Sequence, residues 1–119
     1  MAAPNMVNVT TITGKTAAAN VTTSASNLVS NTASSGKVFK VNSLIISNVD
    51  GTNSADISAS FYRSSVEYFI AKTIPVPADS TLVAISKENP LYLEEGDSIR
   101  VTASANSDLQ AVCSYEEIS

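Results

Sequence analysis

Residues Leu91–Val101, with the sequence LYLEEGDSIRV, decide the fold of this chain. Two short apolar stretches, Leu91–Leu93 and Ile99–Val101, flank an acidic segment that contains one glycine. From Ser98 to Ala105 apolar residues alternate with polar ones, and a repeat of two places neighbouring side chains on opposite faces of a strand. The segment therefore predicts two strands joined by an acidic hairpin turn.

The same alternation occurs at residues 56–62, which predict a further half-buried strand. Val38–Val49 is the strongest β segment, and its apolar phase changes at Asn42 and Ser43, which predicts a bulge or a crossing between sheets. Leu82–Ile85 is apolar on both faces and predicts a central strand. No window shows a convincing helical stripe.

Turns are expected at Gly14-Lys15 and at Arg63–Ser65, and Pro75 with Pro77 is expected to break a strand. A chain of 119 residues fits one domain. We predict an all-β fold, an antiparallel β-sandwich that is jelly-roll-like with about eight strands. Residues 6–119 form the domain, and residues 1–5 are a flexible lead.

The strand phases also predict the core. Cys113, the only cysteine, falls in phase with Leu109 and Ala111 and is expected on the inner face as a small hydrophobe. The residues expected to be almost fully buried are Ile57, Phe61, Leu82, Ile85, Leu93, Ile99 and Val101.

Composition limits the possible partners. Only 15% of the residues are charged, against about 25% in typical soluble domains. Serine (19), threonine (11) and asparagine (10) replace them, which suits a surface that packs against copies of itself. The net charge is −4 and the seven basic residues are scattered, so nucleic-acid binding is not expected. Nor is membrane insertion, since no apolar run approaches about 20 residues. Residues 1–6 do not have the pattern of a signal peptide.

The sequence gives no catalytic residue, cofactor site or metal site. There is no histidine and no Gly-x-Ser-x-Gly motif, so an enzyme is not expected. Glu94, Glu95 and Asp97 could act as general acid and base or bind a hard cation. We favour an exposed hairpin turn in which Gly96 supplies a positive φ, so that serine at all three acidic positions is tolerated.

Two other groups of residues invite a functional interpretation. Asp50, Asn53 and Asp56 around Gly51 resemble a fragment of a calcium loop, but an Asx-type turn is the simpler interpretation. Five aromatic residues could include a platform for stacking sugars, whereas core and cross-strand packing is the favoured alternative. These residues are Tyr62, Tyr68, Phe69, Tyr92 and Tyr115.

Several segments together resemble a known family. They are KVFKVNSLIISNVDG from Lys37, IPVPADSTLV from Ile74, LYLEEGDSIRVTAS from Leu91 and YEEI from Tyr115. Across residues 28–118 the chain is similar to small virion structural proteins of tailed bacteriophages, notably of the marine cyanophage type.

The resemblance implies a β-sandwich that coats or connects parts of a virion in many copies, after assembly in the host bacterial cytoplasm. It implies a non-enzymatic role, with capsid decoration as the first hypothesis and a neck or tail position as the next. Implied partners are copies of the chain itself, with a trimer as the first expectation, and a major capsid or neck/tail protein. A carbohydrate- or receptor-binding module of a fibre is the rival, and a carboxylate hydrolase is a distant third.

Overall fold

The structure is a computed structural model that describes residues 7–119, so the flexible lead expected at residues 1–5 lies outside the described residues. The described part forms nine strands and no helix. In chain order the strands are β1 (Ile12–Val21), β2 (Ser26–Ser30), β3 (Val38–Asn48), β4 (Ala55–Arg63), β5 (Val66–Val76), β6 (Thr81–Ile85), β7 (Leu91–Leu93), β8 (Ser98–Ala103) and β9 (Leu109–Ile118).

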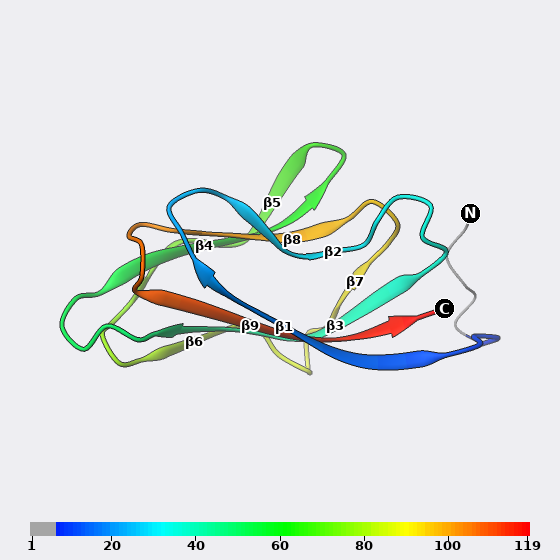
Figure 1. The fold of residues 1–119 in the computed structure, drawn as a ribbon, viewed down its shortest axis with the longest axis horizontal. Coiled ribbons are helices and arrows are strands. Elements are labelled where there is room, and N and C mark those ends of the chain that lie inside the picture. The colour runs from blue at the N-terminus through cyan, green and yellow to red at the C-terminus, as the bar shows by residue number, and fades with distance from the viewer. Residues whose placement is uncertain (1–6) are drawn as a thin grey trace.

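The strands form two antiparallel sheets packed face to face, which appear as the lower and upper layers of Figure 1. Sheet A has the order β1-β9-β3-β6, and β7 also pairs with β3; sheet B has the order β2-β8-β4-β5. Successive strands alternate between the sheets except at β4–β5 and β6–β7. This interleaved order is that of a jelly roll. There are nine strands rather than eight because β6 and β7 occupy two parts of the same edge of β3.

Strand β3 confirms the prediction for residues 38–49 and forms the centre of sheet A. It pairs with β9 along its whole length, with a shift of register between Val41 and Ser43. This shift is the bulge that the change of apolar phase predicted, and it lets both Val41 and Leu44 be fully buried. One strand thereby supplies buried side chains along the full length of the sandwich.

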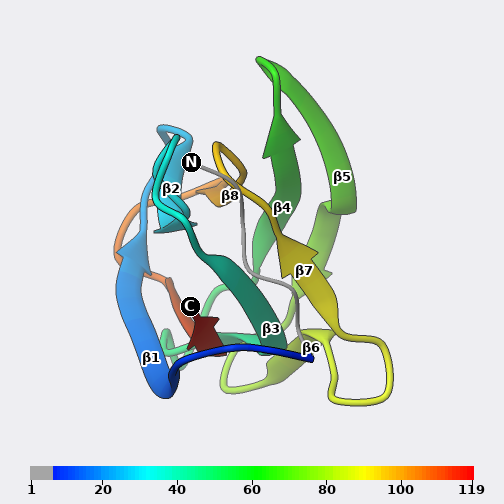
Figure 2. The same cartoon turned by 90° about the vertical axis from the view of Figure 1, so that its right-hand side faces the viewer.

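The core prediction is confirmed for five of the seven residues: Ile57, Ile85, Leu93, Ile99 and Val101 are at most 4% exposed, and Cys113 is fully buried. It is wrong for Phe61 and Leu82, which are only partly buried. Phe61 lies near the tip of the β4–β5 hairpin, which projects beyond the other strands in Figure 2. Leu82 lies in β6 at the edge of sheet A, so the prediction of a central strand at residues 82–85 is also wrong.

Two further sequence predictions fail because pairing partners override local signals. Gly14 and Lys15 do not form a turn but lie inside β1, where Lys15 pairs with Tyr115. Pro75 does not end its strand either, since β5 continues to Val76. Because β5 is the edge strand of sheet B, the missing N–H of Pro75 costs no hydrogen bond within the sheet.

The acidic segment of residues 94–97 does not close a hairpin. β7 pairs with β3 in sheet A, whereas β8 pairs with β2 and β4 in sheet B. The turn between them crosses from one sheet to the other at one end of the sandwich. The hairpin prediction is therefore wrong, although the strands on both sides and the position of the turn were predicted correctly.

We predict that Ile99→Ala lowers the free energy of unfolding by about 2–5 kcal/mol, from lost burial and the cavity that remains. Val49→Ala is the control, because Val49 is 51% exposed and its truncation should change stability by no more than about 0.5 kcal/mol. Urea unfolding followed by circular dichroism measures both. Equal midpoints for the two variants would contradict the assigned inner face of β8.

Candidate functional site

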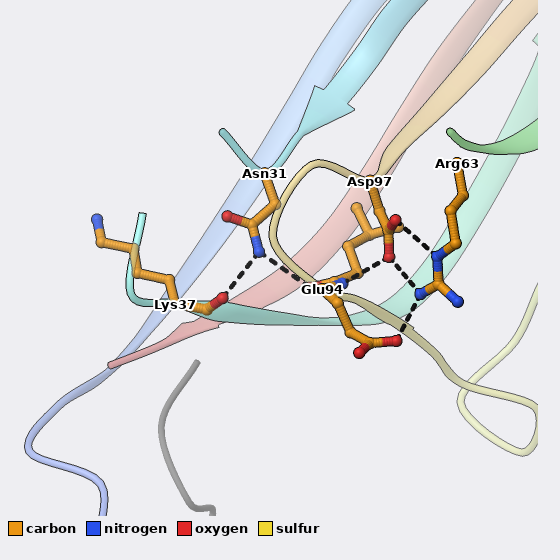
Figure 3. A network of polar contacts seen from close by, with 6 residues as sticks. Asn31, Lys37, Arg63, Glu94 and Asp97 are labelled. Atoms are coloured by element: carbon orange, nitrogen blue, oxygen red, sulfur yellow. Dashed lines mark hydrogen bonds and ion pairs between the residues drawn. The ribbon is translucent and has the colours of Figure 1, made fainter. Parts of the chain in front are cut away.

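Three loops meet at the end of the sandwich where β7 passes into β8. The acidic turn of residues 94–97 lies against the β2–β3 loop of residues 31–37 and against Arg63 at the end of β4, as Figure 3 shows. Backbone hydrogen bonds join the first two: Asn31 N donates to Asp97 O at 2.9 Å, and Gly96 N donates to Asn31 O at 2.8 Å. This cluster therefore joins segments that are far apart in the chain.

Asp97 is the centre of the cluster and is only 2% exposed. Arg63 donates to both of its carboxylate oxygens, from Nε at 2.8 Å and from Nη2 at 2.5 Å. The N–H of Glu94 donates to Asp97 Oδ2 at 2.8 Å. The Asp97 carboxylate raises the pKa of Arg63, first through these hydrogen bonds, so the guanidinium stays charged at every relevant pH. Asp97 thus has the two partners that a buried carboxylate needs.

Glu94 and Glu95 differ from Asp97. The Glu94 carboxylate contacts Arg63 Nη2 at 2.5 Å, yet its side chain is 66% exposed. Glu95 accepts a hydrogen bond from the N–H of Gly36 at 2.9 Å. The interpretation of an exposed acidic turn therefore fits Glu94 but is wrong for Asp97, and Glu95 ties the turn to the neighbouring loop. Gly96 has φ +90°, as the turn prediction requires.

Asn31 is completely buried and satisfies the adjoining loop. Its Nδ2 donates to the carbonyls of Lys37 at 2.9 Å and of Leu93 at 3.0 Å, and its Oδ1 accepts from Ser35 Oγ. A buried amide in this position donates hydrogen bonds to backbone carbonyls that have no donor in a neighbouring strand. No sequence motif marks Asn31 or Arg63, and only the meeting of distant loops reveals them.

A second ion cluster lies beside the first. The Glu117 carboxylate contacts Lys37 Nζ and Lys15 Nζ, the latter at 2.9 Å. Its pKa is lowered, first by the Lys37 hydrogen bond and then by Lys15. A carboxyl with a lowered folded-state pKa stabilises the fold above its unfolded pKa, and this stabilisation is lost as the pH falls through the lowered value. Lys15 has a raised pKa for the same reason, the hydrogen bond to Glu117.

The polar side chains of this cluster hold loops together, and their hydrogen bonds and ion pairs already occupy the groups that a reaction would need. An open depression is lined by Arg63, Ser64 and residues 94–97, but Arg63 is paired there with Glu94 and Asp97, and Glu95 accepts a hydrogen bond from Gly36. Within residues 7–119 no group of three or more Asp, Glu, Cys or His side chains is placed to hold a metal ion. Ser34 and Lys37 have a Ser-x-x-Lys spacing that the sequence predictions did not include, and the Lys37 ammonium is engaged by Glu117.

The predicted Asx-type turn is confirmed at residues 50–53, whereas Asp56 lies in β4 and takes no part in it. Asp50 Oδ1 accepts from the N–H groups of Thr52 at 2.8 Å and Asn53 at 3.3 Å. Asn48, only 3% exposed, repeats the role of Asn31 near this loop: its Nδ2 donates to the carbonyls of Asn53 and Val76. Asn48 was not predicted, because asparagine at the end of a strand gives no sequence signal for burial.

The prediction of core and cross-strand packing for the aromatic residues is confirmed in part, since Tyr68 packs across β4 and β5 against Phe61 at 6.4 Å between ring centroids. Phe39 stacks with Tyr115 at 5.2 Å between ring centroids. By contrast, Tyr68, Phe69 and Tyr92 are 57%, 45% and 42% exposed. Tyr68 and Phe69 are neighbours in β5 and point to opposite faces, and Tyr92 lies in the other sheet. These three rings therefore do not form one platform.

Comparison with known proteins identifies the fold rather than a family. No protein-family model and no curated protein matches the chain. One similar solved chain comes from the disulfide-linked pili of Bacillus endospore appendages, with 15% identity and a TM-score of 0.53 over 90% of this chain and 87% of that one. Another comes from the acid-stable capsid of Helicobacter pylori bacteriophage KHP30, with 8% identity and a TM-score of 0.53 over 94% and 90%.

Among the described residues no helix is long and apolar enough to cross a bilayer. The two similar chains belong to assemblies of many subunits, a pilus and a capsid, and identities this low establish a common fold only. The sandwich predicted from the sequence is thus a fold that is used in particle and filament subunits.

We predict that Asp97→Ser lowers the free energy of unfolding by about 2–4 kcal/mol, because it removes the partners of Arg63 and of the Glu94 N–H. Glu94→Ser, three residues away in the same turn, should cost less than about 1 kcal/mol, since that ion pair is exposed. Thermal melting of the two variants makes the comparison. Equal stability of both variants would show that the buried ion pair contributes nothing.

Gly96→Val is expected to lower stability by about 1–3 kcal/mol, because a β-branched residue is strained at φ +90°. Gly14→Val is the matched control: both positions have open space around an added Cβ, but Gly14 does not have a positive φ. Valine in β1 should leave the melting temperature unchanged or slightly raised. A melting temperature that falls equally in both variants would show that the positive φ of Gly96 is not the cause of the loss.

Proposed function

We propose that this chain is a non-enzymatic structural protein of a phage virion, and that it decorates the capsid in multiple copies. The observation that carries the proposal is the jelly-roll sandwich, whose charged network is used internally to hold three loops together. The likeness to a chain of a phage capsid over 94% of this sequence supports it. The resemblance of residues 28–118 to small virion proteins of tailed phages points the same way.

The single cysteine favours a capsid over a disulfide-linked filament. Subunits joined covalently in series need accessible thiols, whereas Cys113 is fully buried. Burial raises its pKa to about 11, so the thiolate that would form a disulfide is also disfavoured. Assembly in a reducing host cytoplasm is consistent with a thiol of this kind. The 119 residues hold no second cysteine to pair with it.

A neck or tail position is the alternative within the same class. A sugar- or receptor-binding module of a fibre is the alternative from another class, and it finds less support because the exposed aromatic rings lie apart. The proposed partners are copies of the chain and the shell protein beneath them, and nucleic acid and lipid play no part. A trimer on the particle is the expected oligomer from the resemblance.

The proposal predicts a defined phenotype when the gene is deleted from its phage. Decoration proteins reinforce a shell that assembles without them, so we expect complete, tailed particles that lose infectivity faster on heating. Purified chain added back should rebind the particles and restore their heat resistance. Electron microscopy and heat-inactivation curves of deleted, restored and wild-type particles make the measurement.

Each alternative gives a different result in the same experiment. Heads without attached tails would assign the chain to the neck, and intact particles that fail to adsorb to cells would assign it to a fibre. Absence of the chain from purified wild-type particles, tested by mass spectrometry, would overturn the whole proposal.

A further inference from the structure

The outer face of sheet A carries a band of apolar side chains across four strands. Ala18 in β1 is in register with Val112 in β9, Val112 with Ile45 in β3, and Ile45 with Val83 in β6. Val83 is 57% exposed and Val112 is 39% exposed, although their neighbours Ile85, Ala111 and Cys113 are buried on the other side. In Figure 1 this face is the side of the lower layer that points away from sheet B.

Uncharged polar side chains border the band on both sides. One row runs from Asn20 through Gln110 and Ser47 to Thr81, and within it Gln110 Nε2 donates to Asn20 Oδ1 at 3.1 Å. The other row consists of Thr16, Ser114 and Ser43. No residue of the three rows is charged, although the protein as a whole carries −4. An apolar centre, a polar border and a lack of charge are features of protein interfaces.

We propose that this face pairs with the same face of a second copy about a two-fold axis. The face consists of three rows across sheet A: Thr16, Ser114 and Ser43; then Ala18, Val112, Ile45 and Val83; then Asn20, Gln110, Ser47 and Thr81. The inference rests on the proposed structural role, but it replaces the expected trimer with a two-fold pair. The axis lies in the interface, parallel to the strands, midway between Val112 and Ile45. Each copy then presents the same surface to the other, as a two-fold interface requires.

The shape of the band favours this orientation. Ala18 is small, and a shallow hollow lies beside it, lined by Ala18, Ala19, Asn20, Gln110, Ala111 and Val112. The band ends at its other side in the protruding Val83. Rotation about the stated axis places the partner's Val83 over the hollow at Ala18, and the partner's Ile45 over Val112. A two-fold axis perpendicular to the strands would instead place Val83 on the partner's Val83 and leave both hollows empty.

The polar border is complementary in the same orientation. Asn20 faces the partner's Thr81, and Gln110 faces the partner's Ser47, so amides meet hydroxyls that can donate and accept. Because the face has no charge, two copies of a protein with net charge −4 can approach here without placing like charges in contact. The remaining border beyond these rows, at Lys40 and Glu116, carries charges of both signs.

The area fits a weak pair. The three rows span residues 16–20 of β1, and β6 has only 5 residues in all. At about 3.3 Å per residue along a strand and about 4.8 Å between strands, this part of the four strands presents roughly 300 Å² per copy. Two copies therefore bury roughly 600 Å², which is below the range for stable interfaces and is typical of weak, transient contacts. We expect dimerisation in the millimolar range.

Sedimentation of the purified full chain over a range of concentrations tests the pairing. Wild-type protein should reach a dimer. Val83→Lys and Ala18→Glu should each weaken association at least about tenfold, because each places a charge in the apolar centre. The double variant A18E/V83K should recover most of the affinity, since each introduced carboxylate then faces an introduced ammonium of the other copy. Val49→Lys, at a 51% exposed valine outside the three rows, should associate like the wild type.

Four outcomes would overturn the pairing. They are a wild-type chain that stays monomeric into the millimolar range, a trimer as the limiting species, a Val49→Lys effect equal to that of Val83→Lys, and a double variant weaker than either single one. Circular dichroism checks that each variant is folded, as expected for substitutions at exposed positions. The pairing and the proposed function fail separately: a monomeric chain still found on purified particles refutes only the pairing, and a dimeric chain absent from particles refutes only the virion role.

Discussion

Backbone groups at the two ends of the sandwich impose the constraint on which the rest of the structure depends. In a jelly roll most connections pass from one sheet to the other, so their N–H and C=O groups leave the sheet ladders close to the core. At one end the Asn31 amide supplies the missing partners, and at the other end of β3 the Asn48 amide does the same. An apolar residue at either position would fill the volume but would leave one buried and one part-buried carbonyl without these donors.

The buried ion pair of Arg63 and Asp97 extends this principle to a charged group. A carboxylate that is 2% exposed is costly unless it is paired and hydrogen-bonded. Here Arg63 supplies two donors in a fork, and the Glu94 N–H supplies a third. Because Arg63 reaches the turn from the projecting β4–β5 hairpin, the pair also fixes that hairpin against the body of the sandwich. The acidic turn is thus an element of architecture, and the charge of Asp97 ties the start of β8 to the end of β4.

The two faces of sheet A have different roles: the inner face stabilises the fold, and the outer face is the one proposed for association. Its inner face supplies fully buried residues such as Val41, Leu44 and Ile46. Its outer face keeps hydroxyls, amides and a few aliphatic side chains, with charges confined to the border. A pilus chain and a phage capsid chain share this fold, which shows how little the fold itself specifies about the assembly.

The sequence by itself determined most strand positions, because a half-buried strand alternates apolar and polar residues whichever strand it pairs with. It placed β3 with its bulge at residues 42–43, it put Ile99, Val101 and Cys113 on the inner face, and it required a positive φ at Gly96. It could not determine which strands pair. The hairpin expected at residues 91–101, the turn at Gly14-Lys15 and the central position of residues 82–85 all failed for that reason. Only the tertiary structure decided the burial of Asp97, Asn31 and Asn48, because the partners of these side chains lie in loops far apart in the chain or are backbone groups that no residue type reveals.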